Sequence, residues 1–444
     1  RRYPRDAAAA AGADVDAVGP AVLRTARVQL LQGAGALELI GMPLVARVLH
    51  AGEAVVRRFI AKPRLVDEAG VETVERASFA VLDYIQRLLA GKPVASLSLY
   101  PQYAAAQALA GADRVHPADL WSQEVEWHRL PADPTANPMP VDDSVRETME
   151  SLVLPLMRQA DPGLQSAMSD VCAGLGESAQ GDMATLWRLA AAVYQAQAAG
   201  LLATDLHVKR LASRLLAQLR QAVRGEDEAS TRLAQDLLFF CARAKTPADP
   251  RQAPRLAAVQ AAWPQAVGSA SIDYETARLG LHDPAQLTLA RRRVGAAKDV
   301  WSALAGNELH RIGGLHEAFT LLGESIDALF AGGSDLAQVL RAATSKVAAS
   351  QAAPEPALAM EVATSLLYLD AVLEEGELDQ PDLAERMRRM AARIQQVADG
   401  GDAEPLEAWM EELYRRTSDR QTMGSVVQEL RASLSEVEKQ IDQY

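Results

Sequence analysis

The sequence has little of what many catalytic or secreted proteins depend on. Of its 444 residues only two are cysteines, Cys172 and Cys241, and both lie in apolar surroundings, so neither a disulfide framework nor a cysteine-based zinc site is expected. Aromatic residues make up 5%, and alternating runs of Val, Ile, Thr and aromatics are nearly absent, which argues against β-sheet. No stretch approaches the ~18 uncharged apolar residues that cross a membrane. We therefore expect no membrane insertion and a cytoplasmic location.

The sequence also has a deficit of positive charge and no recognisable secretory signal. The formal net charge of −13 argues against nucleic acid as a partner, because phosphate backbones are bound by basic surfaces. The chain begins "RRYPRDAAAA", without a secretory signal or an initiating methionine, and its C-terminal helix has no terminating glycine or proline. We therefore expect a fragment of a longer protein.

Alanine and leucine dominate what is present. Small and unbranched side chains lose little rotamer freedom in helices, so the 49% hydrophobic content predicts an all-α fold of tandem helical bundles. Proline-rich stretches at 129–143 and 244–254 mark boundaries between them. They predict a flexible N-terminus (1–18), a four-helix bundle (19–131), a second bundle (141–246) and a third helical region (255–444), which is one domain or two.

Apolar residues recur at intervals of three and four, the spacing of one buried helix face. The first predicted helix buries Leu23, Ala26, Leu30, Gly33, Leu37 and Ile40; the second buries Val45, Val48, Gly52, Val55 and Phe59; the third buries Val74, Ala77, Val81, Ile85 and Leu88. A fourth, shorter helix is expected from Tyr103 to Leu109. At the other end of the chain a long amphipathic helix is predicted, with Met423, Val427, Leu430, Leu434, Val437 and Ile441 on one face. This last helix packs on its own bundle or forms an intermolecular coiled coil.

The histidines do not form a catalytic or metal-binding pattern. His310 and His316 are six residues apart and so do not share a helix face, and the other histidines have no partner at a metal-ligand spacing. His116, in "RVHPADLW", is expected at a turn or helix entry, and His50 on a solvated face. We predict no catalytic residues, no metal and no cofactor in this chain.

One stretch, "QLLQGAGALELIG" (29–41), resembles the phosphoacceptor helix of histidine phosphotransfer (Hpt) domains, which are four-helix bundles carrying H-x-x-K-G. The glycine matches at Gly33, whereas Gln29 stands at the histidine position and Gln32 at the lysine position. A glutamine carboxamide is not a nucleophile for phosphoryl groups, so this degenerate site cannot carry phosphate. In an active Hpt domain the lysine of this motif offsets the charge of the phosphate, and Gln32 cannot do so.

Further stretches extend the resemblance along the chain from about residue 20 to 444, including "LYPQY", "GADRVHPADLW", "KRLASRLLAQLR", "RLAQDLLFFCA", "ALAMEVATSLLYLDA" and "WMEELYRRTSDRQTMGSVVQELR". In this order they resemble the N-terminal region of the large CheA-like hybrid histidine kinases that control type IV pili (the PilL/ChpA type), and they are similar to the scaffold protein FimL. The resemblance implies Hpt-derived modules that bind partners or dimerise instead of transferring phosphate. Active phosphotransfer, kinase and receiver domains are then expected downstream.

The resemblance also implies a function in chemotaxis-like, two-component signalling that controls twitching motility. The expected partners are pilus-regulatory or polar-hub proteins, or a second copy of the chain, and recruitment to the cell pole is expected with them. One feature favours an alternative: His310-Arg311-Ile312-Gly313-Gly314 repeats the H-x-x-K-G spacing with glycine in place of lysine. His310 is therefore a candidate phosphoacceptor of an active phosphorelay module, or else a structural or solvated histidine.

Overall fold

The computed structural model describes residues 15–419, except 377 and 379, and across these residues the chain forms helices and no strand, which confirms the all-α prediction. The chain divides into two compact units, residues 1–281 and residues 282–444, and each is described by itself. The amphipathic helix predicted from Met423 to Ile441 lies outside the described residues.

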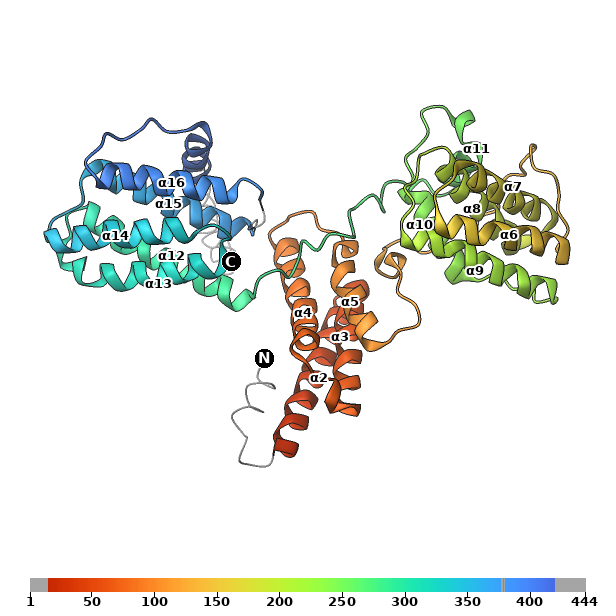
Figure 1. The fold of residues 1–444 in the computed structure, drawn as a ribbon, viewed down its shortest axis with the longest axis horizontal. Coiled ribbons are helices and arrows are strands. Elements are labelled where there is room, and N and C mark those ends of the chain that lie inside the picture. The colour runs from red at the N-terminus through yellow and green to blue at the C-terminus, as the bar shows by residue number, and fades with distance from the viewer. Residues whose placement is uncertain (1–14, 377, 379, 420–444) are drawn as a thin grey trace, which may run out of the picture. The chain divides into compact units, whose positions relative to one another are not determined.

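The first four long helices of unit 1 are α2 (Val15–Leu39), α3 (Pro43–Ala61), α4 (Glu68–Leu89) and α5 (Tyr100–Ala110), and they correspond to the four helices predicted (Figure 1). Pro43 occupies the first turn of α3, where its missing N–H costs nothing, and the Asp67 side chain caps α4 by accepting from the Gly70 N–H at 2.8 Å. Helix α3 is central, since it packs on α2, α4 and α5. All five positions predicted to be buried on α3 are buried.

Two predicted core positions of these helices are exposed. Ile40 lies beyond the end of α2, where Gly41 turns the chain with a left-handed φ of 79°, and Leu88 lies in the last turn of α4. The 3.6-residue periodicity predicts which side chains face the core only within a helix, so the prediction fails where the helix ends. The helix also starts earlier than expected: α2 begins at Val15, inside the segment 1–18 that was predicted to be flexible.

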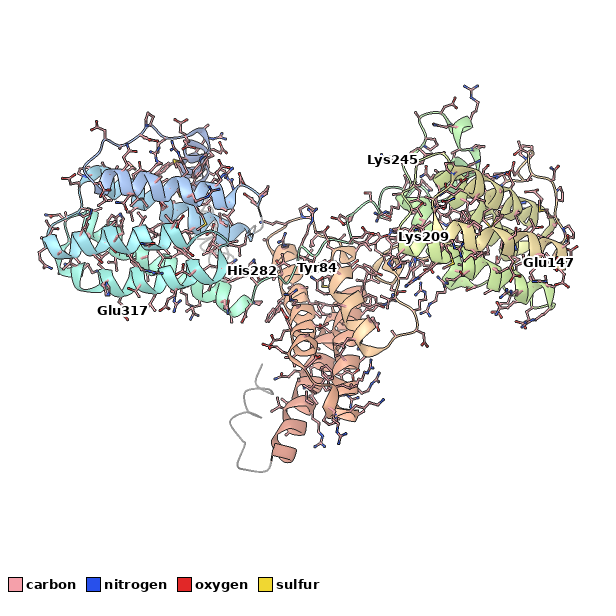
Figure 2. The ribbon with its side chains drawn as sticks, in the orientation of Figure 1. Tyr84, Glu147, Lys209, Lys245, His282 and Glu317 are labelled. Atoms are coloured by element: carbon pink, nitrogen blue, oxygen red, sulfur yellow. The ribbon has the colours of Figure 1, made fainter. Side chains whose placement is uncertain are left out.

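The remaining helices of unit 1 form a second group, and its members are α6 (Asp143–Arg158), α7 (Pro162–Ser178), α8 (Gly181–Ala198), α9 (Leu206–Val223), α10 (Thr231–Arg243) and α11 (Pro254–Ala262). Helix α8 is the centre of this group, because it packs on α7, α10 and α11 and is buried on nearly all sides. Asp142, Asp161, Asp205 and Ser230 cap α6, α7, α9 and α10 through their side chains. Glu147 on α6 is exposed and marks the outer face of this group in Figure 2.

The proline-rich stretch predicted as a boundary is an ordered part of this second group. Residues 121–139, which we call the strap, have no long helix and hydrogen-bond to side chains and backbone of α7, α8, α10 and the segment after α11. Gly174 on α7 permits the closest approach, since an added Cβ would lie 2.6 Å from the Asn137 carbonyl oxygen. Its own carbonyl accepts from the Met139 N–H at 3.0 Å.

The third region was predicted to begin at about residue 255, whereas the structure divides after Leu281. Pro254 starts α11 rather than ending a domain, and Trp263 and Tyr274 are buried in the core of unit 1. The chain then returns to the first four helices: Leu279 accepts a hydrogen bond from Gln102 Nε2 at 2.5 Å, and a Cβ on Gly280 would lie 2.4 Å from the Ala80 backbone nitrogen. These contacts explain why residues 255–281 pack with unit 1.

Unit 2 contains α12 (Pro284–Ala305), η5 (Leu309–Gly314), α13 (Leu315–Leu329), α14 (Ser334–Ser350), α15 (Pro356–Glu375) and α16 (Leu383–Ala398), which lie side by side in Figure 1. Packing runs from α12 to α13, α14, α16, α15 and back to α12, so these helices close around one core. A further helix begins at 408 and covers α15, where Tyr414 and Thr364 hydroxyls are 2.6 Å apart. Glu317 marks the exposed face of α13 in Figure 2.

Helix α15 is long and apolar enough to cross a membrane by length and composition, and it alone passes this test within the described residues. It carries Glu361 and Asp370, and both carboxylates form ion pairs inside unit 2, with Arg393 and Lys298 respectively. More than half of the apolar stretch of α15 is buried within unit 2. This is the pattern of a core helix.

Candidate functional site

The three residues predicted to form a degenerate phosphotransfer site lie on α2 and divide between its two sides. Gln29 and Gln32 are exposed, whereas Gly33 faces α3, where an added Cβ would lie 3.1 Å from Leu49 Cδ1. The surface that an Hpt domain would offer for phosphorylation therefore carries two neutral amides. Neither amide can accept a phosphoryl group.

The outer face of α2 is unusual for a solvated helix because it lacks charge. Residues 28–37 contain no ionisable side chain, and Val28, Leu31 and Leu39 are 51%, 40% and 90% exposed. Helix α2 packs chiefly on α3, and among the described residues of unit 1 no other helix packs closely on its opposite face. Exposed apolar side chains scattered singly are ordinary, so the notable feature of this face is the absence of charge from residue 28 to residue 37.

The alternative phosphoacceptor, His310, is 73% exposed and lies in η5, a short 3₁₀ segment between α12 and α13. Its Nε2 is 3.9 Å from the Glu308 carboxylate, and the space over Gly313 and Gly314 is open. The exposure matches what phosphorylation needs. The backbone does not match, because an Hpt histidine lies on a long bundle helix and here the helix begins only at Leu315.

His116 takes the helix-entry position that the sequence suggested. It is the N-cap of η3 (Pro117–Leu120), where its Nδ1 accepts from the Ala118 N–H at 3.1 Å and Asp119 accepts from the His116 N–H at 3.0 Å. The imidazole is buried, and its Nε2 has no hydrogen-bond partner among the described protein atoms. Burial lowers the pKa of His116 well below its usual value of 6.5, and the positive charges of Arg114 and Arg214 lower it further.

Beside His116 lies a buried ionic cluster that the sequence analysis did not predict. Its centre is Asp236 on α10, which is fully buried and accepts hydrogen bonds from Arg114 and Arg214, with His116 Nδ1 3.1 Å away. Arg114 also binds Asp119 at 2.5 Å. We call these five residues the Asp236 cluster. It joins the segment after α5 to α9 and α10, so it fastens the two helical groups of unit 1 together.

The electrostatics of the Asp236 cluster follow from its burial. Loss of solvent raises the pKa of the Asp236 carboxyl, and this effect exceeds the opposing influence of the Arg114 and Arg214 guanidinium groups. Desolvation also lowers the pKa of His207, whose Nε2 is 3.0 Å from the Tyr100 hydroxyl. The surroundings of the cluster therefore disfavour protonation of His116 and of the neighbouring His207, and the buried Asp236 carboxylate is paired with two cations.

One signal in the sequence could have indicated this cluster. Asp236 stands alone among apolar residues in "LAQDLLFFCA", on the same helix face as Leu233, Leu237 and Phe240, all of which are buried. A lone carboxylate on a buried face requires a cation, because an unpaired buried charge is costly. The identity of that cation could not be read locally, since Arg114 is 122 residues away.

Across the described residues no three His, Cys, Asp or Glu side chains converge as metal ligands would. Cys172 and Cys241 are free and buried, as predicted from their surroundings, and burial raises both thiol pKa values, that of Cys172 to about 12.

The fold and these sites define an all-α protein of packed helical bundles whose described residues form no recognisable catalytic constellation. Residues 134–275 match the family described as the FimL scaffold protein second domain, so over this segment the chain is similar to a domain of a scaffold protein. The predicted resemblance to FimL is thereby confirmed, whereas the kinase and phosphotransfer relationships stay predictions. No curated protein and no solved structure matches the chain significantly.

Proposed function

We propose that the chain is a non-catalytic scaffold region of a signal-transduction histidine kinase that controls type IV pili and twitching motility. The match of residues 134–275 to the second domain of the FimL scaffold protein carries this proposal. In the proposed mechanism, helix faces bind pilus-regulatory or polar-hub proteins in the cytoplasm and recruit the kinase to the cell pole. The exposed amides of Gln29 and Gln32 support binding over phosphoryl transfer, since they present a phosphotransfer-like surface without a nucleophile.

A binding experiment tests the scaffold role directly. The immobilised chain is incubated with lysate of its own organism without ATP, and retained proteins are identified by mass spectrometry. Retention of pilus-regulatory proteins supports the proposal. Loss of that retention in a chain with substitutions on an exposed helix face would locate the surface. If no pilus-regulatory protein is retained, the proposal is wrong.

A second candidate function is phosphotransfer through His310, which its exposure and the open space over Gly313 and Gly314 favour. The chain is incubated with the kinase core of its own system and labelled ATP, and acid-labile phosphohistidine is assayed. The scaffold proposal predicts no label on the chain while an active Hpt module in the same tube is labelled.

The His310→Gln variant decides between the two readings, with His316→Gln as the matched control because His316 is also exposed and lies six residues away. Label that disappears in His310→Gln and persists in His316→Gln would make the chain a working phosphorelay element. Label that survives both substitutions would exclude His310.

A further inference from the structure

We infer that the outer face of α2 binds the same face of a second copy of this chain, in an antiparallel arrangement around a two-fold axis near Leu31. This inference rests on the proposed binding function and names one of its partners. Three observations carry it. The face is uncharged, no other helix among the residues that the structure describes in unit 1 packs closely on it, and two oppositely charged residues bracket it.

The geometry of the face follows from 100° of rotation per residue. Leu23, Ala34 and Leu37 are buried against the rest of unit 1. The opposite side of α2 therefore carries Val28, Gln32 and Leu39, and Gly35 lies at its edge. Gly35 is a depression on this side, because nothing lies within 4 Å of where its Cβ would be. Val28 is a projection two turns away. An apolar knob and a hole on one face are the elements of close helix packing.

If the two-fold axis of the dimer passes between positions 31 and 32, the face of one copy fits the same face of the other. Antiparallel pairing about that axis sets Val28 of each copy over Gly35 of the other, because 28 and 35 are equally distant from it. Leu31 then meets its own equivalent near the axis. An isologous contact of this kind closes after two copies and leaves no open surface for further growth.

Charge complementarity fixes the register. Arg24 and Glu38 each lie about seven residues from the axis, on opposite sides, and both project toward the same flank of the face. In the antiparallel arrangement Arg24 of each copy therefore lies beside Glu38 of the other. Arg24 is exposed and forms no ion pair within the described residues, while Glu38 binds His50 through one oxygen at 3.0 Å and keeps the other available. In a parallel pair in register, Arg24 would instead lie level with Arg24 of the other copy, and Glu38 level with Glu38, so like charges would be brought closer together.

The expected dimer is reversible, because a single pair of helices buries less than the ~1,200 Å² below which interfaces are transient. Sedimentation velocity of the full chain over a range of concentrations is expected to show a monomer–dimer equilibrium. Leu31→Glu is expected to weaken it roughly tenfold or more, since it places two like charges at the axis. Leu154→Glu is the matched control, because Leu154 is comparably exposed but lies on α6.

Charge reversal tests the register. Arg24→Glu and Glu38→Arg are each expected to weaken the dimer, and the double variant is expected to restore it, because the swapped charges again face each other. Cysteine cross-linking gives an independent reading: Leu31→Cys is expected to form an intermolecular disulfide readily. Leu39→Cys is not, since its equivalents lie about 22 Å apart along the axis at 1.5 Å per residue.

Three results would overturn the inference. They are a chain that stays monomeric at every concentration, a dimer that Leu31→Glu leaves unchanged, and equal cross-linking at positions 31 and 39. Each leaves the proposed function standing, because a monomer that still retains pilus-regulatory proteins is a scaffold with other partners. Conversely, a dimer with the expected register that retains no such protein supports this inference and contradicts the proposed function.

Discussion

Both units of the molecule bury charge, but they do so in different ways. In unit 1 the buried member is the anion: Asp236 is fully inaccessible, while the side chains of Arg114 and Arg214 are 21% and 31% exposed. In unit 2 both members are buried, since Arg393 and Glu361 are 2% and 5% exposed and meet through two hydrogen bonds of 2.7 and 2.9 Å. Arg393 also donates to the carbonyls of Glu404 and Pro405.

The Arg393–Glu361 pair and the Asp236 cluster therefore differ in what they do for the fold. The bidentate Arg393–Glu361 pair ties α16 to α15 and to the segment that leads into the last described helix, and it satisfies nearly all of its own hydrogen bonds. The Asp236 cluster joins segments from two helical groups and includes a histidine with a shifted pKa. We therefore expect the pair in unit 2 to matter more for stability and the cluster in unit 1 to respond more to pH.

The largest expected effect is that of Glu361→Gln. It leaves the buried Arg393 guanidinium without its bidentate partner, and the nearest remaining carboxylate oxygen, on Glu404, is 3.7 Å from Nη1. For pairs of this burial the loss costs about 4 kcal/mol. Native-state hydrogen exchange of the full chain, read by mass spectrometry, should show lost protection in α15 and α16 with unit 1 unchanged.

The double variant Arg393→Met/Glu361→Leu is the control for this prediction, because it removes both charges together and replaces them with apolar side chains. Its protection in α15 and α16 should lie close to that of the wild type. A double variant as unstable as Glu361→Gln would show that the hydrogen bonds to Glu404 and Pro405, and not the uncompensated charge, carry the effect.

Asp236→Asn is expected to have a smaller effect, about 3 kcal/mol, although Asp236 is the more buried carboxylate. Arg114 retains Asp119, and the partly exposed Arg214 can turn to water. The same exchange experiment should show lost protection in α9 and α10. A loss larger than that of Glu361→Gln in unit 2 would contradict the comparison.

The smallest expected effect is a pH dependence that arises in unit 1. His116 and His207 have folded pKa values below 6.5, so below that pH the unfolded chain takes up protons that the folded chain does not. The free energy of unfolding therefore falls as pH drops from 6.5 toward the folded pKa values, by at most about 1.4 kcal/mol per pH unit and histidine. Urea unfolding followed by circular dichroism at pH 7.0 and 5.5 measures this slope.

His116→Asn checks the origin of the slope, since asparagine keeps a side-chain oxygen for capping η3 and does not titrate. The variant should show a flatter pH dependence than the wild type. An unchanged slope would assign the effect to other groups.

Much of the helical fold could be predicted from the sequence because the period of apolar residues is local. The α3 pattern shows this best, since every predicted core position from Val45 to Phe59 is buried. The same pattern failed at Ile40 and Leu88, where the helix ends and periodicity no longer reports direction. Proline-rich composition marked the strap as a boundary, but composition cannot distinguish a free linker from a segment held by distant helices.

The candidate sites were less predictable, for a related reason. The amides at Gln29 and Gln32 and the exposed His310 could be found as motifs, because a motif is a short-range pattern. The Asp236 cluster and the self-complementary face of α2 could not. The first depends on residues separated by 122 positions, and the second on which side of α2 the neighbouring helix covers.

The strap has a consequence for how the chain is made. Trp121 donates to Ser269 and Glu126 accepts from Trp263, so these residues meet partners synthesised 148 and 137 positions later. During translation the strap leaves the ribosome long before α10 and α11 exist to hold it, and until then Trp121 and the Glu126 carbonyl lack these partners. The second helical group can therefore close only when about two thirds of the chain has emerged, and release of an earlier truncated product would leave Trp121 without its partner.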